Sequence, residues 1–134
     1  MALAITFRNC LSTNLFRDTV IATIDSGAGN SAILCSGFFQ ENFKSSAYQA
    51  SKEPNFLTAL KKLDSLKTVG IHNNIWLPSY KKFRDNLKNS GVNITAYYKK
   101  GFKWHAKIFI LLRDDSPVFG IIGSSNITAN AFGA

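Results

Sequence analysis

The sequence predicts an α/β fold built on a mixed sheet, and two observations carry that prediction. Over most of the chain, short apolar runs typical of strands alternate with segments in which apolar residues recur every three or four positions, as in helices. The last third of the chain instead holds consecutive strand-like runs with short connections. Strands that alternate with helices favour parallel pairing, and consecutive strands favour antiparallel pairing. We therefore expect a mixed sheet in a three-layer α/β/α sandwich.

Three helices are expected. The first covers about residues 13–26, begins among Ser, Thr and Asn capping types, and ends at Gly27. The second covers residues 56–66, where Phe and Leu recur at helical spacing with lysines between them. The third begins at Pro78, a residue favoured in the first turn of a helix, and stops at Gly91.

Strands are expected between and after these helices, because apolar β-forming runs occur there, bounded by small and polar residues. They are residues 31–36, 67–73, 92–100, 102–112 and 118–125. The segment RDDSP between the last two is typical of a hairpin connection. The final residues, 126–134, resemble the first turn of a further helix. We therefore expect one domain over residues 1–134 that is truncated at its C-terminus.

Composition narrows the class of protein. Hydrophobic residues make up 46% of the 134 residues and charged residues 18%, which is an ordinary globular balance. The formal net charge of +8 favours an anionic partner such as nucleic acid. No apolar run is long enough to span a membrane and no secretory signal precedes the fold, so a cytoplasmic protein without membrane contact is expected. Cys10 and Cys35 are interpreted as buried, reduced thiols.

One strand carries polar residues where an apolar pattern predicts burial. Side chains alternate along a strand, so His105 and Lys107 share a face. Because residues on both faces of this strand are apolar, we expect it to be central. If RDDSP is a hairpin, pairing places His105 beside Ser125 and Lys107 beside Gly123. The sequence therefore predicts that the Gly-Ser-Ser-Asn segment lies next to the His-Lys pair.

These residues together predict a site for a phosphate group. An imidazole, an ammonium group, the Ser124 hydroxyl and the Asn126 amide form a cationic and donor-rich pocket, in which Gly123 keeps the space open. A helix beginning near Ile127 would direct its N-terminal amides at the same place, which favours an anion. An unpaired charge buried here would be costly without such a ligand.

The motifs resemble those of the phospholipase D superfamily, in which His-x-Lys is followed by Gly-Ser/Gly-x-Asn. His105-Ala-Lys107 and Gly123-Ser-Ser-Asn126 match that pattern. The order of predicted elements from Ser31 onward also resembles one half of that family's fold. The local sequences WHAKIFIL and GSSNIT look most like bacterial nuclease members, including domains of restriction endonucleases.

This resemblance implies a metal-independent phosphodiesterase with no cofactor. His105 would be the nucleophile and form a phosphohistidine that water hydrolyses. Lys107, Asn126 and Ser124 would bind the phosphoryl oxygens, with Ser125 beside them. The family builds each active site from two motifs, so a chain with one motif is expected to form a homodimer that shares one active-site region.

The sequence departs from the family pattern in its carboxylates. The family has an Asp five positions after the lysine, and that position here is Leu112. The Asp pair in RDDSP lies too far along to replace it. The resemblance therefore assigns no partner that orients His105, and Glu41, in the loop after the first strand, is the candidate substitute.

Other functions are alternatives to a metal-independent DNA endonuclease. A metal-dependent nuclease is disfavoured because the carboxylates are scattered along the chain. A phospholipid phosphodiesterase, and a non-catalytic module that binds nucleic acid or acts as a scaffold, remain alternatives to a DNA endonuclease. His72 is interpreted as a core or surface histidine. Phe38 and Phe39 are interpreted as core residues, with a place in the wall of the site or of the dimer as the alternative. Three lysines near the start of the strand that carries the motif are candidates for lining a path for a polyanion: Lys99, Lys100 and Lys103.

Overall fold

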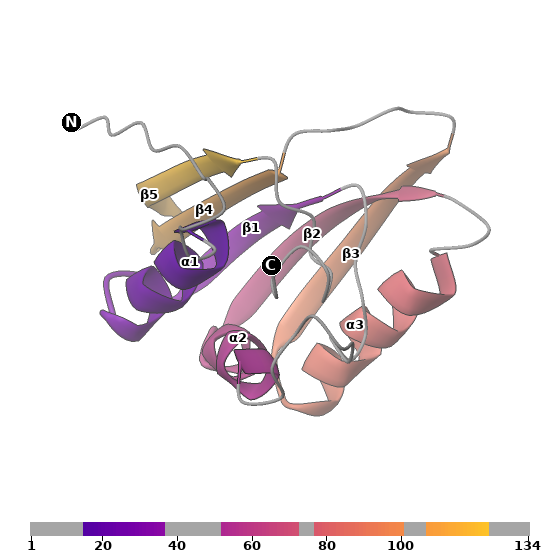
Figure 1. The fold of residues 1–134 in the computed structure, drawn as a ribbon, viewed down its shortest axis with the longest axis horizontal. Helices are drawn as coiled ribbons and strands as arrows, with labels where there is room; N and C mark the ends of the chain where they lie inside the picture. Colours follow the sequence, from indigo (N-terminus) through magenta and orange to yellow (C-terminus); the bar gives the residue numbers. More distant parts are fainter. Residues whose placement is uncertain (1–14, 37–51, 73–76, 101–106, 124–134) are drawn as a thin grey trace.

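The computed structural model describes residues 15–36, 52–72, 77–100 and 107–123 and confirms the α/β class. Helices and strands alternate through the first six elements, and two consecutive strands follow (Figure 1). The elements are α1 (Leu15–Asp25), β1 (Ser31–Cys35), α2 (Lys52–Lys61), β2 (Ser65–His72), α3 (Leu77–Asn89), β3 (Asn93–Lys100), β4 (Lys107–Arg113) and β5 (Ser116–Gly123).

The described strands form one mixed sheet in the order β3-β2-β1-β4-β5. β1, β2 and β3 run parallel, each joined to the next through a helix. β4 pairs antiparallel with β1, and β5 pairs antiparallel with β4. The motif strand β4 is therefore central, as its apolar pattern predicted, with a neighbour on each side.

The three described helices lie on one face of the sheet (Figure 1). α1 contacts β4 and β5, α3 contacts β2 and β3, and α2 contacts both other helices. The described residues thus form two layers, and the third layer of the predicted sandwich stays a prediction. Of the helices that the structure describes, none has the length and apolar character needed to cross a membrane.

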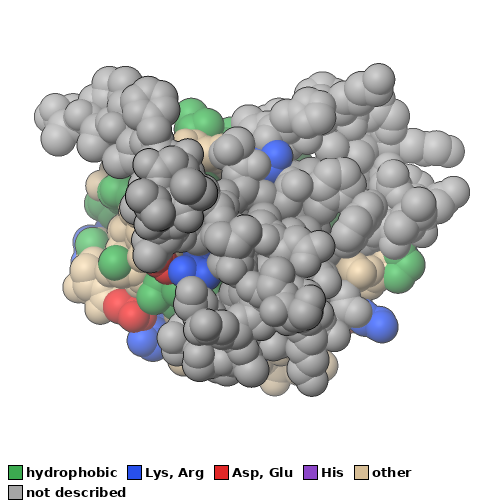
Figure 2. Space-filling view, viewed as in Figure 1, with side chains coloured by type: hydrophobic (Ala, Val, Ile, Leu, Met, Phe, Trp, Pro, Cys, Tyr) green, Lys and Arg blue, Asp and Glu red, His purple; other side chains and the backbone are tan. Residues whose placement is uncertain are grey.

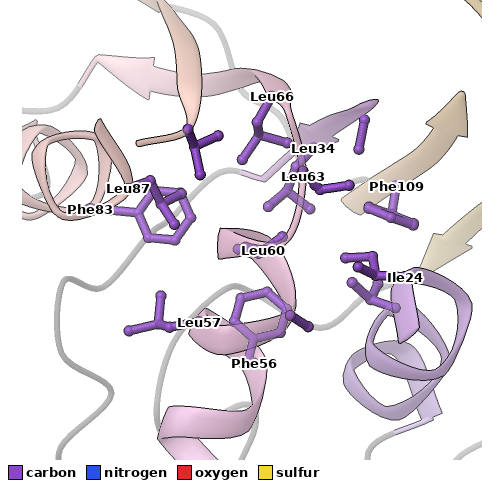
Figure 3. Packing of buried hydrophobic residues seen from close by; sticks show 14 of the residues in the cluster. Ile24, Leu34, Phe56, Leu57, Leu60, Leu63, Leu66, Phe83, Leu87 and Phe109 are labelled. Carbon is purple, nitrogen blue, oxygen red and sulfur yellow. The ribbon is translucent and has the colours of Figure 1, made fainter. Parts of the chain in front are cut away.

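The core lies between this helical layer and the sheet. Leu34, Leu66 and Phe109 point from three adjacent strands toward the helices (Figure 3). Apolar side chains from every helix meet them there: Phe16, Val20 and Ile24 of α1, Phe56, Leu57, Ala59 and Leu60 of α2, and Tyr80, Phe83 and Leu87 of α3. Burial of large apolar side chains is the main favourable contribution to folding, at roughly 1.5 to 3 kcal/mol for each.

The opposite face of the sheet carries an apolar row that crosses all five strands. Register places its members side by side, one from each strand: Tyr97, Val69, Cys35, Ile108 and Ile122. At the two outer strands the row is open to solvent, since Tyr97 is 54% exposed and Ile122 is 75% exposed. Cys35 is a free, buried thiol, as predicted, and burial raises its pKa. Cys10 lies outside the described residues.

The predicted boundaries of α2 were wrong at both ends. The helix begins at Lys52, ahead of Pro54, because a proline in the first turn sacrifices no helical hydrogen bond. It ends at Lys61, and Leu66 belongs to β2, although its spacing continues the helical pattern. The Asp64 amide bonds to the Asn30 carbonyl, which starts the parallel pairing of β2 with β1 and ends the helix.

The hairpin between β4 and β5 confirms the predicted register. Lys107 pairs with Gly123, and the connection is a two-residue turn at Asp114 and Asp115. Both aspartates have positive φ, which is the conformation that tight hairpin turns require and that Asp tolerates. The register shifts by one residue between Leu111 and Leu112. β5 begins two residues earlier than predicted, at Ser116 instead of residue 118.

Candidate active site

One end of the sheet holds Lys107 and Gly123, the two residues of the predicted motif that the structure describes. β1, β2 and β3 end there, β4 begins there at Lys107, and β5 ends there at Gly123. The segment with His105 precedes β4, and the Gly-Ser-Ser-Asn segment continues from β5, so the chain attaches both at this end. We call it the carboxyl end of the sheet. Ligand sites of open α/β sheets lie outside the carboxyl ends of parallel strands.

Lys107 lies on the helix-covered face, on the same side of β4 as Phe109 and Leu111. Only 5% of the residue is exposed, whereas lysines are seldom buried to this degree. Burial lowers the pKa of its ammonium group, because the charged form loses hydration. A buried cation at the end of a sheet is suited to contact an anion, and the predicted face of Lys107 is confirmed.

Ser36 is a polar residue of this end that the sequence analysis missed. It directly follows β1, is fully buried, and donates its backbone amide to the carbonyl of Val69 at 3.1 Å. Cys35, the last residue of β1, pairs with Ile108, so the register continued by one position brings Ser36 next to Lys107. The available signal was a serine at the carboxyl end of a buried strand, which is where sites of such sheets gather.

Gly123 has a structural role in the packing of α1, while its predicted role in the site stays a prediction. A Cβ atom at this position would lie 3.0 Å from the ring of Phe16. The space beside Gly123 is therefore taken by the first turn of α1 on the helix-covered face. The glycine allows α1 to approach β5 closely, and this approach brings the beginning of α1 to the carboxyl end of the sheet.

A buried hydrogen-bond chain supports the same end from α3. The Tyr80 hydroxyl donates to the carbonyl of Tyr97 at 2.8 Å and lies 2.8 Å from the Thr68 hydroxyl. Since the tyrosine has one proton, Thr68 donates to it. Burial raises the pKa of Tyr80 to about 12. The ring of Tyr80 also packs over Gly70, so α3, β2 and β3 are fixed to one another here.

Several predicted site residues lie outside the described residues, and their predicted roles stay predictions. They are His105, Ser124, Ser125, Asn126, Glu41 and Lys103, together with Phe38 and Phe39. Lys99 and Lys100 end β3 and pair with residues 71 and 72, so their backbone reaches the carboxyl end. The side chains of these lysines and of His72 are not described. β3 is three strands from β4, roughly 14 Å away at the usual spacing between strands.

Among the described residues, the cationic side chains seen on one face lie at separate places. Figure 2 shows Lys and Arg side chains (blue) at separate places among apolar and polar groups. Within the described ranges, no three His, Cys, Asp or Glu side chains are grouped so that they could hold a metal ion. Within the described residues, the candidate site is therefore defined by its buried polar groups.

A comparison with protein families assigns the chain. The family model described as the NgoFVII restriction endonuclease N-terminal PLD domain matches residues 66–134, slightly more than half of the chain. The chain belongs to this family. A search of curated proteins found no match.

The NgoFVII PLD-domain match runs from β2 to the last residue of the sequence and includes the whole motif region. The resemblance to the phospholipase D superfamily seen in the motifs is thereby confirmed, and the α/β fold with its mixed sheet is consistent with it. Membership in a restriction-endonuclease domain family indicates a nuclease-like role.

Proposed function

We propose that this protein is a metal-independent phosphodiesterase that cleaves DNA, as the catalytic domain of a restriction enzyme would. The observation that carries the proposal is Lys107, a buried cation paired with Gly123 at the carboxyl end of the sheet. The family match supports the nuclease class. The net charge of +8 supports a polyanionic substrate, because a basic protein can neutralise several phosphates at once.

The proposed reaction has two steps. In the first, an imidazole nitrogen of His105 attacks the phosphorus atom, and the bond from phosphorus to the leaving oxygen breaks. In the second, water attacks the phosphohistidine and restores the free imidazole. Lys107, Asn126 and Ser124 hold the non-bridging oxygens, whose negative charge grows in each transition state. The low exposure of Lys107 strengthens its attraction for that charge, because little water screens it.

A homodimer completes the proposed site. The leaving oxygen needs a proton, and a chain with one His-x-Lys motif supplies one histidine to the reaction centre. A twofold axis beside the carboxyl end would bring a second His105 to the leaving oxygen as general acid. Mass measurement in solution tests this assembly. Co-expression of wild type with His105→Ala should give mixed dimers with strongly reduced activity.

The decisive experiment is incubation of plasmid DNA with the protein in excess EDTA. We expect nicked or linear product from the wild type and none from His105→Ala, while both proteins bind the DNA in a mobility-shift assay. Binding without cleavage by the wild type would contradict the proposed enzyme and favour a non-catalytic DNA-binding module. Cleavage that persists in His105→Ala would contradict the proposed nucleophile.

Hydrolysis of phospholipid is a second candidate with one observation in its favour. Tyr98 and Ile122 lie near the carboxyl end and are 51% and 75% exposed, and an enzyme at a lipid surface requires exposed apolar groups near its site. The same EDTA reaction with phosphatidylcholine vesicles distinguishes the two. Release of headgroup at a rate above that of DNA cleavage would favour the lipid substrate.

The proposal includes a single domain whose sheet is covered on both faces. The apolar row from Tyr97 to Ile122 supports a third layer, because exposed apolar surface of this extent is costly in water. One cooperative unfolding transition and weak binding of a hydrophobic dye are expected for the whole protein. Strong dye binding by the native state would contradict a covered second face.

A further inference from the structure

The direction of α1 brings its first turn to the carboxyl end of the sheet. Its last turn lies at the opposite end, where Arg113 donates to the carbonyls of Gly27 and Ala28, just after the helix. Its first turn lies against β5, since Phe16 occupies the space beside Gly123. Gly123 is the partner of Lys107 in the sheet. The residues that open α1 are therefore close neighbours of the candidate site.

The rows of side chains on α1 show where Arg17 is directed. Phe16, Val20 and Ile24 face the sheet, and Asp25 faces the end of α2, where it pairs with Lys62 at 2.7 Å. With 3.6 residues per turn, position 17 lies between these two rows. Its side chain is thus directed into the angle between the sheet and α2. Helical side chains also lean toward the helix N-terminus, which here is the carboxyl end of the sheet.

Arg17 is buried in that angle. The residue is 3% exposed, and its Nε donates to Oδ1 of Asp18 at 2.8 Å, a carboxylate on a side chain that is 42% exposed. Within the described ranges, the charged residues that are buried are Arg17 and Lys107, and both are cations. A buried cation beside the candidate site is placed to contact an anion that binds there. A guanidinium group suits a phosphate, because its planar fork can donate to two oxygens at once.

We propose that Arg17 is a second phosphate-binding residue of the active site and contacts the non-bridging oxygens of the phosphodiester that Lys107 binds. The inference rests on the proposed function for the identity of the substrate. It rests on the structure for the location, the burial and the charge of Arg17. Lys107 reaches the phosphate from the sheet, and Arg17 reaches it from the helical layer, so the two cations approach different oxygens.

The chain offers a matched control for this proposal. Arg84 of α3 forms the same local contact as Arg17, with Nε donating to Oδ1 of the following residue, Asp85, at 2.8 Å. The Arg84 side chain is 38% exposed, however, and belongs to the surface of α3. Arg84→Gln removes the corresponding ion pair between adjacent residues and leaves α1 and Lys107 unchanged. A comparison of Arg17→Gln with Arg84→Gln therefore distinguishes the effect of losing a site residue from the effect of losing a local ion pair.

The first test uses inorganic phosphate and needs no catalytic activity. We expect phosphate to raise the melting temperature of the wild type and of Arg84→Gln, relative to chloride at equal ionic strength. The rise should fall by at least half in Arg17→Gln. An equal rise in Arg17→Gln, or no rise in the wild type, would overturn the proposal. This readout is independent of the nuclease assay, so failure of DNA cleavage does not decide it.

The second test uses duplex DNA in a His105→Ala background, in which cleavage is removed. The slope of log Kd against log salt should decrease by about 1 for Arg17→Gln, as expected for one lost phosphate contact. Arg84→Gln should keep the parent slope. In the active background, Arg17→Gln should lower kcat/KM by about 10²-fold. An unchanged slope together with unchanged kcat/KM would overturn the proposal.

A conservative variant covers the case in which Arg17→Gln fails to fold. Arg17→Lys keeps the charge but loses the planar fork. In a folded Arg17→Lys protein, we expect a reduced rise in melting temperature with phosphate and a lowered kcat/KM. Wild-type values of both quantities would show that the fork contacts no phosphate and would overturn the inference.

Discussion

The two ends of the sheet are built in different ways. At the hairpin end, backbone bonds join the starts of the parallel strands, from Asn93 to Asp64, from Asp64 to Asn30, and from Asn30 to Leu112. At the carboxyl end, polar and charged residues are buried instead: Ser36 directly after β1 and Lys107 at the start of the adjacent strand β4. The first arrangement joins strands through their backbones, whereas the second places polar and charged groups in the interior. The contrast is the reason that the proposed function is assigned to the carboxyl end.

The largest effect is expected from Lys107→Met at the carboxyl end. DNA cleavage should fall by about 10³-fold, because a cation that stabilises the transition state is lost. The free energy of unfolding should not decrease, since burial already lowers the pKa of Lys107 and opposes its charged form. Activity assays and urea denaturation measure the two quantities. Lys67→Met, at an exposed position of β2, is the control and should retain wild-type activity.

The pH dependence of activity follows from the lowered pKa of Lys107. Because burial lowers the folded pKa of Lys107, its charge is lost at a lower pH than that of an exposed lysine. Activity should therefore decline at a lower alkaline pH than an exposed lysine would give. A profile that stays flat up to the ordinary lysine pKa would argue against a role for this charge.

At the hairpin end, Gly29→Ala should reduce stability without changing the site. An added Cβ would lie 2.5 Å from both the Leu111 side chain and the Leu112 carbonyl oxygen. We expect a loss of about 3 kcal/mol in the free energy of unfolding, from overpacking against backbone. Gly27→Ala is the comparison, because its added Cβ meets no atom within 4 Å and its cost, about 1 kcal/mol, comes from positive φ alone. Equal losses in the two variants would refute the steric explanation.

Tyr80→Phe sharpens the comparison at the carboxyl end. It removes the donor to the Tyr97 carbonyl and the acceptor for Thr68, and should cost about 1 to 2 kcal/mol. The folded pKa of about 12 exceeds the unfolded value of about 10, so wild-type stability from this group is complete below pH 10 and is lost as pH rises toward 12. Urea denaturation at several alkaline pH values should show a shallower decline for Tyr80→Phe. Tyr98→Phe, at an exposed position, should behave as wild type.

Arg113→Met tests the side-chain contacts of the hairpin end. Arg113 donates to the carbonyls of Gly27 and Ala28, and both contacts are exposed. The expected loss is about 1 kcal/mol, because water replaces each bond in part. Activity measured well below the melting temperature should be unchanged. A strong loss of activity in a stable protein would mean that the two ends are coupled.

The smallest effect is expected from Asp25→Asn. Its ion pair with Lys62 is half-exposed on both sides, and exposed pairs contribute less than about 1 kcal/mol. Thermal unfolding at low and high salt should give nearly equal melting temperatures for wild type and variant. A large, salt-dependent difference would indicate that α1 depends on this pair for its docking on α2.

The strict alternation of side chains between the two faces of β4 made the hairpin predictable from the sequence. Lys107, Phe109 and Leu111 point to one side of β4, and the short connection left one register that pairs Lys107 with Gly123. The ends of α2 were not predictable in the same way. Pro54 resembles a residue that precedes a helix, but it lies in the first turn of α2. Leu66 continues the helical spacing of apolar residues, but it belongs to β2.

Other features depended on tertiary contacts that no local pattern contains. Arg17 reads as an ordinary polar position of an amphipathic helix, and its burial follows only from how α1 meets both the sheet and α2. Ser36 reads as a small loop residue until the pairing of Cys35 with Ile108 brings it to Lys107. Residues that pack between elements are thus the part of the site that sequence reading misses.

The middle strand of the sheet has a consequence for how the chain acquires its structure during synthesis. β1 emerges early from the ribosome, yet its second neighbour, β4, follows only after α2, β2, α3 and β3. Until then one edge of an apolar strand is unpaired, which is a site for chaperone binding or for association between nascent chains. Arrival of the β4–β5 hairpin ends this interval, and the same event brings Lys107 into the protein interior.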